Sequence, residues 1–229
     1  MTQLERTTSS SWALAIVQAL ELEGLSGPDL FAELGMDYAV LGDPDARIAQ
    51  DQMTRLWERA VALSGNPSIG LNMARVIRPG HFNVVGFALL SSVNLREGLA
   101  RLVRYQRIIG EASDMTLQQS PDSYTRELHI HGDRVPAPRQ SHDAALAYML
   151  GFFRWMSGEN ILPLQVTFAY EQPADISAHE ALFQCPMVFG ARCYSMGFAR
   201  DIMDARLASG NATLAQMHDQ FAGDYLARF

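Results

Sequence analysis

Apolar residues recur at helical spacing in the first third of the chain. In the first run they fall three or four positions apart, at Trp12, Ile16, Ala19 and Leu20. Ser11 precedes this run as a candidate N-cap residue, and Gly24 follows it as a residue suited to a helix C-terminus. Comparable patterns and their flanking breakers predict further helices over 28–35, 51–63 and 68–76. The N-terminal part is therefore predicted to be helical.

Two apolar segments follow. The first, 82–90, contains glycine, and its pattern is compatible with a helix or a strand. The second, 94–109, is predicted to be a helix because its leucines gather on one side. Its other side carries charges at helical spacing, at Glu97, Arg101, Arg104 and Arg107. We interpret this charged side as a solvent-exposed helix face.

Alternating apolar and polar residues predict strands in the second half of the chain. Two of these strands, 115–119 and 124–131, surround Pro121-Asp122 and are expected to form a hairpin. Further strands are predicted over 164–170 and 193–198. We expect these strands to form a small mixed or antiparallel sheet.

A buried central helix is predicted between the strands. The segment 142–156 is apolar on nearly every side, with Ser141 as its candidate cap and Gly158 at its end. A capping box at 177–180 predicts a second, short helix. The chain is expected to turn helical again from position 201 onward.

These patterns together predict an α+β fold, in which a helical N-terminal part packs on the sheet region around the buried helix. No internal repeat or linker divides the chain. The last segment, 214–229, is amphipathic and has no helix-ending signal. We therefore expect that this helix leads toward a further domain.

Composition predicts a folded cytoplasmic protein without membrane contact. Hydrophobic residues make up 48% of the 229 residues and charged residues 19%, as in packed globular proteins. The longest apolar run, 144–153, is about half as long as a membrane span. The N-terminus lacks the apolar core of a signal peptide. The two cysteines are too few for a disulfide scaffold.

Charge argues against direct contact with nucleic acid. The net charge is −7, and all 18 basic residues are arginines. Domains that bind DNA usually present a basic face that neutralises several phosphates. DNA is therefore not expected as a direct partner of these residues.

Motifs for catalysis or cofactor binding are not found in the sequence. It contains no phosphate-binding glycine loop, nucleophile elbow or zinc signature, so we predict no cofactor. Cys185 precedes a proline and is interpreted as a buried small residue rather than a nucleophile. The pair His129 and His131, with His142 as a third ligand, could hold a metal ion, but a packing or solvated role is favoured and no metal is predicted.

Several stretches, in order, resemble the N-terminal effector domain of AraC-type transcription regulators, the arabinose-binding-like branch. The resemblance begins at 24–35 and 56–74 and is strongest at 79–111, where a glycine-punctuated apolar segment precedes an arginine-rich helix. It resumes at LPLQVTFAYEQP (162–173), FQCPMVF (183–189) and MDARL (203–207). This resemblance implies a domain that senses a small molecule or mediates self-association. It also implies a C-terminal helix-turn-helix unit, outside this chain, that binds DNA.

The resemblance predicts a domain division and a binding site. Residues 1–213 are expected to form the regulatory domain, and 214–229 the start of a linker helix toward the DNA-binding unit. The ligand pocket is expected between the helix 142–156 and the strands. The candidate ligand contacts are Arg78, His81, Phe82, Tyr105 and Trp155.

Three functions are compatible with a domain of this kind. The first is a small-molecule sensor that also forms a homodimer through the exposed face of 94–109 or through the terminal helix. The second is a dimerisation module without a ligand. The third is an α+β enzyme, which is disfavoured because no nucleophile and base can be paired.

Overall fold

The N-terminal part of the chain is helical, as its apolar periodicity predicts. The computed structural model describes residues 5–227 and places two short strands there, β1 (Thr7–Ser9) and β2 (Arg47–Ala49), which pair in antiparallel fashion. The helices of this part are α1 (Ser10–Glu21), α2 (Gly27–Glu33) and α3 (Gln50–Ser64), with the 3-10 helices η1 (Tyr38–Gly42) and η2 (Ile69–Arg75). Ser9, not Ser11, caps α1 by accepting a hydrogen bond from the Trp12 backbone N–H.

The segment of ambiguous pattern, 82–90, is helical. Its first residue, Phe82, is the last residue of a 3-10 helix, η3 (Pro79–Phe82), and Val84–Leu90 form α4. Gly86 lies so close to the turn before it that a Cβ atom would collide with the Pro79 carbonyl group. This close approach explains the glycine within the apolar run.

The predicted helix 94–109 is two helices, α5 (Leu95–Arg104) and α6 (Gln106–Ile109). They are separated at Tyr105, which leaves the helical conformation at φ −105° and ψ 15°. The Tyr105 side chain is buried, and its hydroxyl donates a hydrogen bond to the Asp219 carbonyl oxygen. A contact distant in sequence accompanies the break, which periodicity alone could not indicate.

The second half of the chain contains a five-stranded mixed sheet in the order β3-β4-β7-β5-β6. The predicted hairpin is confirmed, because β3 (Ser113–Gln119) pairs with β4 (Ser123–Ile130) in antiparallel fashion. β7 (Tyr194–Ala199) joins β4 to β5 (Gln165–Thr167), and β5 pairs in parallel with β6 (Met187–Val188). The strand predicted over 164–170 is shorter than expected, because β5 ends at Thr167. Beyond it, the Tyr170 hydroxyl donates to the Asp143 carboxylate at 2.6 Å.

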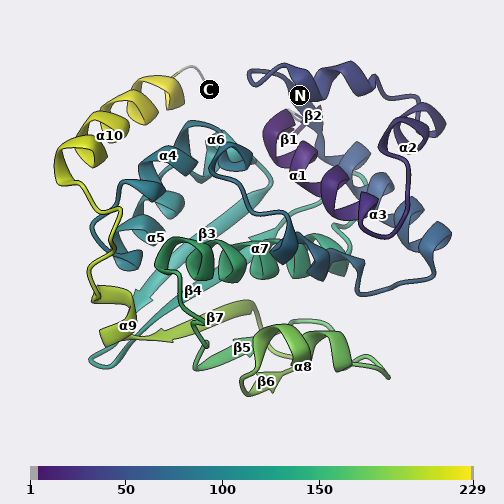
Figure 1. Cartoon of the computed structure of the whole chain (residues 1–229). Coiled ribbons are helices and arrows are strands. Elements are labelled where there is room, and N and C mark those ends of the chain that lie inside the picture. Colours follow the sequence, from purple (N-terminus) through teal and green to yellow (C-terminus); the bar gives the residue numbers. More distant parts are fainter. Residues whose placement is uncertain (1–4, 228–229) are drawn as a thin grey trace.

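The predicted central helix is α7 (Arg139–Ser157), and most of its side chains are buried. It lies across one face of the sheet, in front of β3 and β4 in the view of Figure 1, and contacts both η2 and β4. Gly158 ends it in the left-handed conformation, as predicted. Ser141 does not cap it, because the helix already begins at Arg139.

The remaining helices lie along the outside of the fold. α8 (Ser177–Phe183) forms where the capping box predicts a helix, but Asp175 accepts the Ser177 backbone N–H and no capping-box bond forms. α9 (Arg200–Asp204) follows β7, and α10 (Ala212–Leu226) runs back beside α4 (Figure 1). The predicted regulatory domain begins, and the predicted linker helix ends, outside the described residues, because residues 1–4 and 228–229 are not described.

Aromatic rings join the N-terminal helices to α7. Trp12 of α1 stacks on Phe82 with ring centroids 5.6 Å apart, and both rings meet Tyr148 of α7 edge to face at 4.9 Å. Such pairs stabilise a core beyond the burial of their area alone. The α+β fold class is therefore confirmed, with one core shared by the helices and the sheet. Within residues 5–227, no helix combines the length and the apolarity needed to cross a membrane.

Candidate functional site

A cavity of about 70 Å³ lies where the N-terminal helices meet α7 and the sheet. One water molecule needs roughly 10–15 Å³ of such volume, so the cavity can hold a molecule of several non-hydrogen atoms. Most of its lining is apolar, including Trp12, Met53, Trp57, Phe82, Leu102 and Met149. Because protein interiors are normally close-packed, this cavity is the candidate ligand site.

Among the described residues that line this cavity, Arg126 is the one with an ionisable side chain. It stands in β4 between Tyr124 and Leu128, and all three are buried on the inner face of the strand. Only 2% of Arg126 is exposed to solvent. Arg126 is not among the residues predicted to contact a ligand, although its place in the alternation of 124–131 puts a charge on the apolar face.

The Arg126 guanidinium has few hydrogen-bond partners and no counterion among the described lining residues. Its Nη2 atom donates to the weakly accepting Met115 Sδ at 3.0 Å, while Nε and Nη1 are buried and have no hydrogen-bond partner among the described residues. No Asp or Glu is found among the described residues that line the cavity. Burial lowers the pKa of Arg126 to about 10, so the group still carries its charge at neutral pH. A buried charge without a counterion destabilises a fold.

Of the five residues predicted to contact a ligand, Phe82 lines this cavity. Arg78 and His81 are not among the residues that line it. The Tyr148 hydroxyl donates to the Arg78 carbonyl at 2.8 Å and lies 3.0 Å from His81 Nδ1. Burial, followed by the charge of Arg78, lowers the pKa of His81 to about 4. His81 is therefore neutral at physiological pH.

The other two predicted contacts lie elsewhere. Tyr105 is buried beneath α10, and Trp155 is 48% exposed at the end of α7, where its ring packs on Phe152. The pocket was expected between the buried helix and the strands. α7, β3 and β4 do line the cavity, and α1 and α3 close its other side.

The three histidines considered as metal ligands, His129, His131 and His142, contact other protein groups. The rings of His129 and His131 lie 4.3 Å apart, and His131 Nε2 lies 2.6 Å from an Asp114 carboxylate oxygen. His142, the third ligand considered, accepts the Ile130 backbone N–H through Nε2 at 3.2 Å. Across residues 5–227, no three His, Cys, Asp or Glu side chains are grouped to hold a metal ion.

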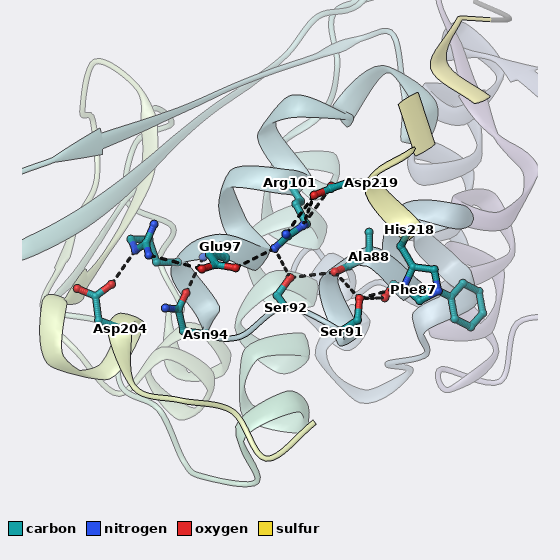
Figure 2. A network of polar contacts seen from close by, with 11 residues as sticks. Phe87, Ala88, Ser91, Ser92, Asn94, Glu97, Arg101, Asp204, His218 and Asp219 are labelled. Carbon is teal, nitrogen blue, oxygen red and sulfur yellow. Dashed lines mark hydrogen bonds and ion pairs between the residues drawn. The ribbon is translucent and has the colours of Figure 1, made fainter. Parts of the chain in front are cut away.

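Figure 2 shows a polar network that holds α10 against α4 and α5. The Arg101 guanidinium contacts the Asp219 carboxylate at 3.1 Å, the Ser92 hydroxyl at 3.0 Å and Glu97 at 3.3 Å. The Ser91 hydroxyl lies 2.9 Å from His218 Nδ1. The interpretation of 94–109 as having a solvent-exposed charged side is therefore wrong at Arg101, whose side chain is only 15% exposed because α10 covers it.

Comparison with known proteins identifies the family. Residues 24–207 match the model for the arabinose-binding domain of AraC transcription regulators, N-terminal. The chain is 25% identical over 213 residues to the ornithine utilization regulator of Pseudomonas aeruginosa, covering 92% of this chain and 62% of that protein. It is also 31% identical over 114 residues to an uncharacterized HTH-type transcriptional regulator of Mycobacterium tuberculosis, covering 48% of this chain and 33% of that protein.

The fold agrees with this assignment. The crystal structure of the transcriptional regulator CdpR from Pseudomonas aeruginosa matches with a TM-score of 0.68 at 15% identity, over 94% of this chain and 64% of that one. The chain thus spans less than two thirds of these two Pseudomonas regulators. The chain belongs to the family of N-terminal arabinose-binding domains of AraC transcription regulators.

Proposed function

We propose that this domain binds a small-molecule effector in the cavity around Arg126 and thereby controls DNA binding by another part of an intact regulator. The observation that carries the proposal is an apolar cavity containing a buried, unpaired guanidinium. Empty volume and an unpaired charge both destabilise a fold. A ligand that fills the cavity and pairs with the Arg126 charge would remove both destabilising effects.

The α5 helix offers a physical connection from the cavity to α10. Leu102 of α5 lines the cavity, while the adjacent Arg101 binds Asp219 of α10. Tyr105, at the end of α5, also bonds α10. An effector shifts an equilibrium only by as much as it favours one arrangement over the other. We propose that occupancy of the cavity changes how firmly α5 holds α10, and that 214–229 lead toward a DNA-binding unit.

Self-association through α10 is proposed alongside sensing. Leu214, Met217 and Phe221 stand on one side of α10 at 45%, 60% and 55% exposure, whereas Ala222 and Tyr225 face the domain. An exposed apolar stripe of this kind is typical of an interface. We propose that two copies pair along it to form a homodimer. As part of a bacterial transcription regulator, the domain would act in the cytoplasm.

An enzyme is disfavoured on the same observations. Acid–base or nucleophilic catalysis needs at least two cooperating groups, and the described lining of the cavity offers Arg126 as its ionisable side chain. Burial raises the pKa of the Cys185 thiol, which opposes thiolate formation. The family is one of transcription regulators.

A metabolite screen with a cavity-filling variant tests the proposal. Thermal unfolding is measured with panels of organic acids, amino acids and sugars, using wild type, Ala145→Leu in the cavity lining and Ala178→Leu on the exposed side of α8. A true effector raises the Tm of wild type and of Ala178→Leu but not that of Ala145→Leu. The proposal fails if no compound distinguishes the cavity variant from its control.

A further inference from the structure

The cavity also constrains the chemical class of its occupant. Resting on the proposed sensing function, we propose that the effector is a singly charged organic anion, a monocarboxylate with a compact apolar body, whose carboxylate pairs with Arg126. The guanidinium has donors without partners, and its planar array of N–H groups matches a carboxylate better than any other side chain does. The carboxylate supplies both the missing acceptor and the missing negative charge.

Protein carboxylates on the flanking elements are committed to other donors. Asp51 of α3 accepts the backbone N–H groups of Arg134 and Val135. Asp143 of α7 accepts the Tyr170 hydroxyl through Oδ1 at 2.6 Å, and its Oδ2 atom lies 3.6 Å from His179 Nε2. On β4 itself, Glu127 accepts from Gln118 on the outer face of the strand. The counterion for Arg126 must therefore come from outside this set.

The residues that line the cavity favour an effector with one negative charge and no positive charge. A dicarboxylate or a phosphate monoester would leave a second negative charge without a cation, because Arg126 is the one cationic side chain in the described lining. A diamino acid such as ornithine would bring ammonium groups into a cavity whose described lining has no Asp or Glu. Indole and phenyl rings from Trp12, Trp57 and Phe82 surround the remaining space. These surfaces suit a short aliphatic or aromatic body.

A set of defined probes tests the charge requirement. Binding of butanoate, hexanoate, octanoate and benzoate is measured calorimetrically at constant ionic strength, against the matched amides, alkylammonium ions, succinate, hexyl phosphate and L-ornithine. At least one monocarboxylate is expected to bind at least about tenfold more tightly than its amide, as a charge-assisted hydrogen bond predicts. The inference is overturned if no monocarboxylate binds below about 1 mM, or if the amides, the phosphate or the dianions bind equally well.

Two variants separate this inference from the function on which it rests. Arg126→Met keeps an unbranched apolar stem, shorter than that of arginine, and removes the charged guanidinium. It should therefore lose the preference for carboxylate over amide and raise the Tm of the ligand-free protein. A lowered ligand-free Tm would show that Arg126 is satisfied within the fold, and would overturn the inference. If neutral compounds bind wild type but not Ala145→Leu, the sensing function survives and only the anion assignment fails. If no compound distinguishes these proteins, both fail.

Discussion

The Arg101 guanidinium of α5 and the Asp219 carboxylate of α10 form an ion pair across 118 residues of sequence. Two nitrogens of the guanidinium contact the carboxylate at 3.1 Å, and a third binds Ser92. Both partners are largely buried, so this pair is screened less than a surface ion pair. It is the main polar attachment between the helix that lines the cavity and the last helix of the chain.

Arg101→Ala is expected to loosen α10 while the rest of the fold persists. The substitution leaves Asp219 without its cation and removes the bond to Ser92, which should cost about 1–3 kcal/mol of local stability. Amide hydrogen exchange in 212–226 should accelerate roughly tenfold or more, with little change in β4 or α7. Arg104→Ala, an exposed position on the same helix, serves as the control. Equal exchange rates in the two variants would contradict the role given to this ion pair.

The exposed stripe of α10 is expected to mediate dimerisation. Met217→Glu with Phe221→Glu places two charges where apolar side chains would pair, and should shift sedimentation toward the monomer by at least tenfold in the dissociation constant. Leu63→Glu, which changes another exposed apolar residue distant in sequence, should leave association unchanged. A wild-type protein that is strictly monomeric at high micromolar concentration would exclude this interface.

Gly86→Ala should destabilise the fold severely, although alanine favours helices. The added methyl group would collide with the Pro79 carbonyl, and a rigid backbone atom cannot move aside as a flexible side chain can. We expect a loss of about 3 kcal/mol or more in the free energy of unfolding, measured with urea. Gly80→Ala is the matched control, because no atom lies within 4 Å of its added Cβ. Similar stabilities for the two variants would refute the close approach of η3 to α4.

Acidification should destabilise the protein before its carboxylates titrate. Burial, with the charge of Arg78, lowers the pKa of His81 to about 4, and burial, with the nearby His129 and His131, lowers that of His142 to about 4. The ordinary value is 6.5. The unfolded chain therefore binds more protons between these values, so stability falls as pH drops through 6.5 and levels off below about 4.

From pH 7.5 to 5.5 each of these histidines should remove about 1.3 kcal/mol from the free energy of unfolding. Urea titrations of wild type and His81→Gln at both pH values measure the effect. His81→Gln should reduce the pH dependence by about the contribution of one histidine. An undiminished dependence in His81→Gln would show that His81 is not held neutral by the fold.

Arg126 shows which features of the candidate site could not be predicted from the sequence. Alternation correctly placed the hairpin strands, and it assigned 124, 126 and 128 to one face of β4. It could not show that Arg126 meets no carboxylate there, because that depends on which side chains α3, α5 and α7 bring to the same space. Of the predicted contacts, only Phe82 reaches the cavity. The roles proposed for Arg78, His81, Tyr105 and Trp155 in ligand binding stay predictions.

The sequence by itself determined the α+β class, the helical N-terminal part, the buried helix ending at Gly158 and the family. These features rest on local periodicity, on backbone preferences and on the order of motifs along the chain, which a sequence displays directly. Only the tertiary structure decided that Arg101 is covered by α10, that Tyr105 separates two helices, and that Arg126 stands unpaired in a cavity. The first two depend on Asp219, more than 100 positions away, meeting α5 in space, and the third depends on the several elements that line the cavity around Arg126. Local patterns carry no information about such meetings.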